Sequence, residues 1–438
     1  MKLRIFQSYS GDCLLLESSD GAHRILCDGG TPDAMRAFGA KGVSQLQKEG
    51  KDIDLLYVSH IDSDHIGGVM VLLETALEWQ VFDYHHANGD PPAEPELPRP
   101  PAIKRLWHNG FRDMVTKNTG AIEKLLAASA PVLSTSTDPD LQHHGHEYAK
   151  IATSIKEALR VSRLVKPELL GIELNTLTQT PAHSGKLLMA RGDMKPEKLG
   201  SLTVTILCPT PGELRDLRKG WNNWLDKPAS KKAVKAIRDM YASALEAGAV
   251  GNGMSPFDLY GWEGLPAYKG VTVPNVASLV LLVEDGGKSV LLTGDSHADM
   301  ILKGLRDEGR LNDGYFHVDV LKFPHHGATD NLSPDFTKEL SADHYVFCGD
   351  GSHSNPELEV LRRVYDSRLG PASKRVKTPG LDGRPFHIWF STSSMTPNSS
   401  KQVTHMTNVE AWAADAAARS NGVFKAHFND KLYLDVKL

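Results

Sequence analysis

Short apolar runs separated by turn residues dominate the beginning of the chain. The runs span residues 3–7, 12–17, 23–27 and 53–58. Runs of this length between Gly, Asp and Ser residues are typical of β-strands. After the fourth run the period changes, because apolar residues recur at a spacing of three and four from Val69 to Leu77. This change predicts that the fourth strand leads through a polar turn into a helix.

Strand-like runs return after residue 271, where they alternate with helical segments. Strands are predicted at 277–284, 289–293, 318–323, 344–348, 386–390 and 431–436, and helices at 300–305 and 356–365. An alternation of strand, turn and helix is typical of an α/β fold.

The middle of the chain differs from both ends. Six of the eleven residues from 91 to 101 are proline, which predicts a stiff surface connector. Helical spacing follows at 148–159 and 233–245, with one strand-like run at 202–208 between them. We therefore predict three parts. They are a core formed by residues 1–85 and 271–395, a mainly helical insertion at 86–270, and a C-terminal extension at 396–438.

Composition narrows the class of protein. The 438 residues include 49 basic and 54 acidic side chains, for a formal net charge of −5. This balance argues against a protein that coats nucleic acid through a broad basic face, although a groove or a metal can still hold a phosphodiester. The four cysteines lack paired spacing, which indicates buried thiols in a reducing compartment. No signal peptide and no apolar run of membrane-spanning length is apparent, so we expect a cytoplasmic protein without membrane contact.

Candidate chemistry lies in the polar turn after the fourth strand. His60, Asp62, Asp64 and His65 occur within six residues, directly before Ile66 and a Gly-Gly pair. A short loop between a strand and a helix points such side chains toward one position, and their nitrogen and oxygen donors suit divalent ions. We therefore predict a metal site here. A chance cluster of exposed His and Asp residues is the alternative interpretation.

Two later strands also end in metal-binding residue types. Asp295 follows the strand at 289–293, and His325 and His326 follow the strand at 318–323. Corresponding strand ends converge in space in α/β proteins, even when they lie far apart in sequence. We therefore expect these residues to join the same site. Taken alone, Asp295 would be interpreted as an ordinary turn residue.

This set of motifs resembles the metallo-β-lactamase-fold hydrolases, whose signature is HxHxDH, a bridging aspartate and a late histidine. Further stretches look like the branch that contains the hydrolase domain of DNA-uptake competence channels, namely residues 11–16, 25–30, 275–281, 291–295 and 321–327. The resemblance covers residues 3–85 and 271–365. It implies an α/β (α+β) fold, the αββα sandwich, here with a large mainly helical insertion, and a centre of two divalent metal ions.

The resemblance also implies a ligand set. One ion would be held by His60, Asp62 and a third histidine, the other by Asp64, His65 and either His325 or His326, with Asp295 bridging them. His108 is favoured as the third histidine because residues 103–107 form a plausible next strand. The alternatives, which stay open on the sequence, are His85, His86 and His183.

One position departs from the signature, because Asp62 stands where the second histidine of HxHxDH is expected. A carboxylate oxygen is a harder ligand than an imidazole nitrogen. We therefore expect zinc or manganese in the centre, with iron also compatible, and a weaker preference for zinc than in a site with two histidines.

By resemblance, the expected activity is metal-dependent hydrolysis through a hydroxide that bridges the two ions. Asp64 and His353 are the expected catalytic residues, and His353 would touch the leaving group or a phosphate. A phosphodiesterase or nuclease acting on single-stranded nucleic acid or a nucleotide is the first choice of function. Hydrolysis of a carbonyl ester, lactone or thioester is the second, and a non-catalytic metal-binding scaffold is the third.

Overall fold

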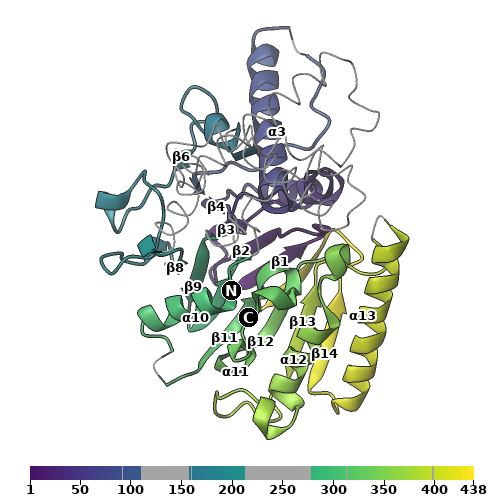
Figure 1. Ribbon diagram of the computed structural model, residues 1–438. Coiled ribbons are helices and arrows are strands. Elements are labelled where there is room, and N and C mark those ends of the chain that lie inside the picture. Colours follow the sequence, from purple (N-terminus) through teal and green to yellow (C-terminus); the bar gives the residue numbers. More distant parts are fainter. Residues whose placement is uncertain (91, 110–156, 159, 213–277, 312, 397–398) are drawn as a thin grey trace, which may run out of the picture.

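The computed structural model describes residues 1–90, 92–109, 157–158, 160–212, 278–311, 313–396 and 399–438, which form two mixed β-sheets with helices on their outer faces (Figure 1). The expected helices at 148–159 and 233–245 fall largely or wholly outside these residues. Within the described part, no helix is both long and apolar enough to span a membrane.

The first sheet has the strand order β15-β1-β2-β3-β4-β5-β6. Its strands are β1 (Lys2–Phe6), β2 (Leu14–Glu17), β3 (Arg24–Cys27), β4 (Leu55–Tyr57), β5 (Arg105–Trp107), β6 (Glu173–Leu174) and β15 (Tyr433–Lys437). Pairing is antiparallel from β15 to β3 and parallel from β3 to β6.

The second sheet has the order β14-β13-β12-β11-β10-β9-β8-β7. Its strands are β7 (Glu197–Leu199), β8 (Leu202–Cys208), β9 (Val280–Asp285), β10 (Lys288–Leu292), β11 (Phe316–Lys322), β12 (Leu340–Phe347), β13 (Phe386–Phe390) and β14 (Phe424–Phe428). Pairing is antiparallel from β7 to β10 and parallel from β10 to β14.

Helices cover the sheets on their outer sides (Figure 1). The longer ones are α2 (Ala40–Lys48), α3 (Ser63–Ala87), α10 (Ala298–Asp307), α12 (Leu358–Leu369) and α13 (Ser400–Arg419). The shorter helical segments are α1 (Pro32–Ala34), η1 (Met35–Gly39), η2 (Pro181–His183), η4 (Pro324–Gly327), η5 (Thr329–Asn331), α11 (Phe336–Glu339), η6 (Ser352–Ser354) and η7 (Ala372–Lys374).

Alternation along each strand divides the core into layers. On β10, Val290 and Leu292 face the cluster between the two sheets, whereas Leu291 faces the cluster beneath the helices of the second sheet. Successive side chains of a strand point to opposite faces, so a continuous apolar run is buried on both sides. The same layering under α3 gives the αββα sandwich that the family resemblance implies.

The expected insertion and extension contribute strands to both sheets. β5 and β6 extend the first sheet and β7 and β8 extend the second, although all four lie between residues 86 and 270. The segment after residue 396 supplies α13 and the edge strands β14 and β15, of which only β15 was expected. The strands of the expected insertion (86–270) and extension (396–438) therefore pair with strands of the expected core. Such pairing uses backbone hydrogen bonds, which require no sequence motif.

A close approach of two backbones fixes the start of α3. A Cβ atom on Gly68 would lie 2.0 Å from the carbonyl oxygen of Gly29, and one on Gly29 would lie 2.2 Å from the amide nitrogen of Val69. Hydrogen bonds join the same segments, from Gly68 N to Gly30 O at 2.9 Å and from Gly29 N to His65 O at 2.9 Å. Only glycine permits this contact, which holds the first turn of α3 against the end of β3.

We predict that Gly68→Ala destabilises the protein by about 3 kcal/mol, because the added methyl group meets backbone that cannot move aside. Gly192→Ala is the matched control, since a Cβ at Gly192 meets nothing within 4 Å, and its effect should stay within about 0.5 kcal/mol. Denaturant unfolding of both variants measures the difference. Equal stability of the two variants would show that the contact does not constrain α3.

Candidate metal centre

The ends of three strands bring the predicted site residues to one edge of the sandwich. His60 lies three residues beyond β4, Asp295 three residues beyond β10, and His326 four residues beyond β11. Asp62 precedes α3 as its N-cap residue, and its carbonyl accepts the amide of His65 at 2.8 Å. Asp64 and His65 therefore lie in the first turn of the helix, where a negative charge is favourable.

Three imidazoles point their Nε2 atoms at the carboxylate of Asp295. The Nε2 atoms of His60, His65 and His326 lie 3.7, 3.5 and 3.2 Å from its nearer oxygens. Asp62 Oδ2 lies 3.6 Å from His60 Nε2, and Asp64 Oδ2 lies 3.4 Å from His326 Nε2. Asp295 is thus the centre of the cluster.

The opposite nitrogens of the rings face groups that fix their orientation. His65 Nδ1 lies 2.9 Å from Asp28 Oδ2 and His326 Nδ1 lies 3.4 Å from Asp12 Oδ1. Ser59 Oγ donates to Asp28 and therefore accepts from His60 Nδ1 at 3.0 Å. A neutral imidazole that donates through Nδ1 keeps a lone pair on Nε2. In the neutral form, all three rings thus present a lone pair to the same space.

The residues of the cluster fit divalent metal ions. The buried Nε2 atoms of His60, His65 and His326 have no hydrogen-bond partner within the described residues. A buried polar atom without a partner costs about 1–3 kcal/mol, so such atoms normally have a function. Converging imidazole nitrogens and carboxylate oxygens are the donor set of zinc, manganese and iron sites.

The pKa values of Asp295 and His326 are shifted by the opposite charges that surround them in the cluster. Burial alone would raise the pKa of Asp295, but His326, His65 and Lys322 hold it well below its usual value. Burial alone would lower the pKa of His326, but the neighbouring carboxylates, led by Asp295, raise it well above its usual value. The same carboxylates raise the pKa of His65, so protons and metal ions compete for the nitrogens of His65 and His326.

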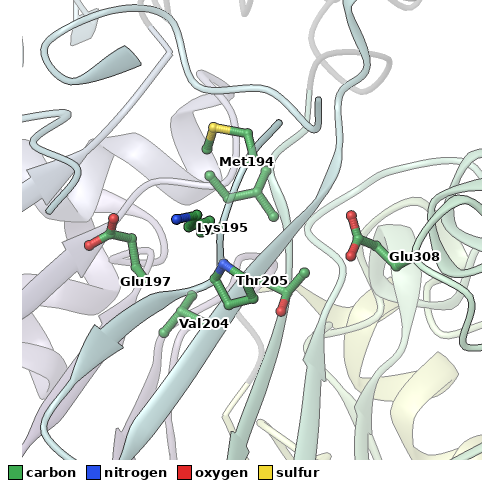
Figure 2. A pocket seen from close by; sticks show the side chains of 8 residues that line it. Met194, Lys195, Glu197, Val204, Thr205 and Glu308 are labelled. Carbon is green, nitrogen blue, oxygen red and sulfur yellow. The ribbon is translucent and has the colours of Figure 1, made fainter. Parts of the chain in front are cut away.

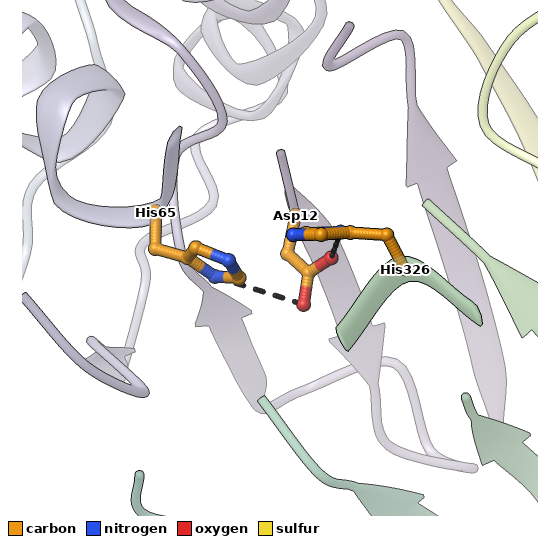
Figure 3. A group of neighbouring side chains, drawn as sticks. All are labelled: Asp12, His65 and His326. Carbon is orange, nitrogen blue, oxygen red and sulfur yellow. Dashed lines mark ion pairs between the residues drawn. The ribbon is translucent and has the colours of Figure 1, made fainter. Parts of the chain in front are cut away.

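Asp12 belongs to a second group with His65 and His326, shown in Figure 3 with its carboxylate between the two rings. In this group Asp12 Oδ2 lies 3.7 Å from His65 Nδ1, on the side of the ring that also faces Asp28. The ammonium of Lys322 contacts the same Asp12 oxygen. Because a cation already occupies that side, Asp12 fits an orienting carboxylate better than a metal ligand.

The two late histidines have different surroundings. The His326 side chain is 7% exposed and its Nε2 faces both Asp64 and Asp295, whereas that of His325 is 30% exposed. Asn331 donates to the carbonyl of Asp295 at 3.0 Å, so its oxygen accepts from His325 Nδ1 at 2.8 Å. His325 Nε2 then lies 3.9 Å from Asp295 Oδ2. His326 is thus inside the cluster and His325 at its exposed side.

His108 stays a prediction as the third histidine. It follows β5, which pairs in parallel with β4, and its backbone is held on both sides by the Asn175 side chain. The ring is buried, neither of its nitrogens has a hydrogen-bond partner among the described residues, and burial lowers its pKa to about 4. Neither of the two His/Asp groups among the described residues includes it.

The other histidine alternatives lie elsewhere. His85 and His86 are exposed at the far end of α3, and a rise of 1.5 Å per residue puts them about 30 Å from His65. His183 pairs with Asp193 at 2.8 Å near the surface. His353 lies in η6, in the loop after β12, with a φ of 54°. Its expected contact with substrate stays a prediction.

Sequence reasoning missed the residues that surround the ligands. Asp28, which lies directly before the Gly29-Gly30 turn, accepts from Ser59 N at 2.7 Å and faces His65. Asp12 and Lys322 were not singled out, although both lie within stretches that carry the family resemblance. Their signal was a charged residue within an apolar strand-like run, which is costly unless it is paired.

A separate small pocket lies beside β7 and β8 (Figure 2). Glu197 and Glu308 lie on opposite sides of it, and Lys195 and Thr205 also line it. It includes none of the residues that face Asp295. The pocket therefore offers no support for a second reaction centre.

We predict that His326→Ala removes bound metal, whereas His325→Ala retains it, because only His326 has a buried nitrogen between Asp64 and Asp295. Metal content per chain after gel filtration should fall by at least about tenfold in His326→Ala. Thermal unfolding of both metal-free variants controls for misfolding. Loss of metal in His325→Ala alone would reverse the assignment.

Comparison with protein families agrees with this geometry. The family model described as the metallo-beta-lactamase superfamily matches residues 9–146, a segment that contains Asp12, Asp28 and the loop from His60 to His65. A search of curated proteins finds no match. Members of this superfamily are generally metal-dependent hydrolases. Together with the two-sheet architecture, the match identifies a metallo-beta-lactamase superfamily domain at residues 9–146.

Proposed function

We propose that this protein is a metal-dependent hydrolase with a centre for two divalent ions. The observation that carries the proposal is the convergence of three buried, unpaired Nε2 atoms on Asp295. The nearly complete donor set favours an enzyme over a non-catalytic scaffold.

The family resemblance implies two groups of ligands. His60 and Asp62 form one group, for which His108 is the proposed third ligand. Asp64, His65 and His326 form the other. Asp295 serves both, because its Oδ2 faces His60 and His326 while its Oδ1 faces His65. A carboxylate with both oxygens directed at ligand nitrogens is suited to bridge two ions.

Divalent ions held here would lower the pKa of water and polarise an electrophilic phosphorus or carbonyl group. The chain itself supplies orientation at the open side. His325 is held by Asn331, and its Nε2 lies 3.9 Å from Asp295 Oδ2 at the exposed side of the cluster, where it can meet a substrate oxygen. The Asp64 side chain is 31% exposed and lies where substrate would approach. We propose that Asp64 and His325, with His353 as predicted, contact the reacting group.

A phosphodiester is the proposed substrate class. The resemblance to the hydrolase domain of competence channels supports it, and the net charge of −5 favours a nucleotide or a single strand over long duplex DNA. A carbonyl ester, lactone or thioester is the second candidate, because the same ligands polarise a carbonyl group equally well. For the metal, the oxygen ligand Asp62 supports manganese or iron beside zinc.

The test compares hydrolysis of bis-p-nitrophenyl phosphate, single-stranded oligonucleotides, and p-nitrophenyl and lactone esters with added Mn²⁺ or Zn²⁺. We expect the phosphodiesters to be turned over, and we expect Asp295→Ala to lower kcat/KM at least about 100-fold. Asp319→Ala is the matched control, because Asp319 pairs with Lys288 outside the centre. Turnover of the carbonyl esters alone would favour the second candidate function, a carbonyl ester, lactone or thioester hydrolase. A metal-loaded protein that is inactive on every substrate would favour the non-catalytic metal-binding scaffold.

A further inference from the structure

A lysine is buried beside the metal centre. Lys322 is the last residue of β11, and its side chain is 1% exposed. Its ammonium donates to Gly294 O at 2.8 Å, faces Asp295 Oδ1 at 3.4 Å and contacts Asp12 Oδ2. These three acceptors account for all three N–H groups of the ammonium. Lys322 is therefore fully engaged inside the protein and is not available to bind substrate.

The partners of Lys322 connect it to three proposed ligands. It touches Asp295 directly, and through Asp12 it reaches the Nδ1 atoms of His326 and His65, which lie 3.4 and 3.7 Å from that carboxylate. Its own backbone carbonyl accepts from Thr293 Oγ1 at 2.8 Å, just before Asp295. One side chain thus joins the loop after β1, the end of β10 and the end of β11.

The number of charges in the centre indicates that Lys322 balances one of its carboxylates. Within the part of the chain that the structure describes, five aspartates meet the cluster, namely Asp12, Asp28, Asp62, Asp64 and Asp295. Two divalent ions and one ammonium together carry the five positive charges that balance them. Without metal ions, Lys322 is the one permanent cation among the described side chains that contact the cluster. Its pKa is raised above the usual value because Asp12 and Asp295 outweigh the effect of burial, so it stays charged.

We propose that Lys322 is a resident cation of the centre, which balances the charges of Asp12 and Asp295 before metal ions bind. A buried carboxylate that loses its partner costs several kilocalories per mole and moves toward water. Removing Lys322 therefore leaves two carboxylates uncompensated in the metal-free protein. Added metal ions supply part of the missing charge. This inference rests on the proposed function, because it requires that metal ions bind at Asp295.

The test measures thermal unfolding of wild type, Lys322→Met and the double variant Asp12→Asn/Lys322→Met, each metal-free and saturated with Mn²⁺. Lys322→Met should lower the metal-free Tm by about 5–10 °C, and Mn²⁺ should raise its Tm by more than it raises that of wild type. The double variant should regain part of the metal-free stability, because one unpaired carboxylate has been neutralised. Lys288→Met is the matched control, since that lysine pairs with Asp319 at 2.9 Å on the neighbouring strand and is 42% exposed.

The outcomes separate this proposal from the proposed function. If Mn²⁺ stabilises wild type but gives Lys322→Met an equal or smaller gain, Lys322 is a packing residue and the inference is wrong. A double variant no more stable than Lys322→Met would contradict it in the same way. If Lys322→Met fails to fold while the double variant folds, the inference is supported. If no metal ion stabilises wild type, the proposed function itself fails.

Discussion

Asp295 is buried at the junction of the two sheets and faces three imidazole nitrogens at 3.2–3.7 Å. A carboxylate in this position needs nearby positive charge, because an unpaired buried charge is among the costliest defects in a folded protein. Lys322 supplies one cation, and protons or metal ions must supply the rest. The arrangement of the surrounding loops follows from this requirement, since each loop contributes either a ligand or a group that orients one.

The scaffold meets the requirement through strand order. Parallel pairing of β3 with β4 puts Asp28 beside the loop that carries His60 and His65, and parallel pairing of β10 with β11 puts Asp295 beside Lys322 and His326. The layer between the sheets is largely apolar, and the polar side chains of the centre gather where strands end. The contact of Gly29 with Gly68 then holds the first turn of α3 close enough for His65 to reach Asp28. The strand order and the glycine contact that define the fold therefore also position the residues of the site.

Much of this arrangement could be predicted from the sequence, because its signals are local. The run before His60 and the helical spacing after it predicted β4 and α3, and the strand-end positions of Asp295 and His326 predicted that they meet. The orienting residues were harder to predict. Asp12 forms an ion pair with Lys322, which lies 310 positions away in the sequence. No local sequence pattern indicates such a pair. Whether His325 or His326 faces the centre depends on the backbone conformation of the two residues, whose φ angles are 46° and 54°. Two identical adjacent residues give no sequence signal for this conformation. The strands β5 to β8 were assigned to an insertion because a proline-rich segment and helical spacing set the middle of the chain apart, and pairing with strands distant in sequence leaves no local pattern.

The central claim is that metal ions bind on the Nε2 side of these rings, with Asp295 between them. An X-ray anomalous difference map of the manganese-loaded protein tests it most directly. We predict two peaks roughly 3.5–4 Å apart, both beside the Asp295 carboxylate and both facing Nε2 atoms. A peak between Asp12 and the Nδ1 atoms of His65 and His326, or no peak near Asp295, would contradict the account.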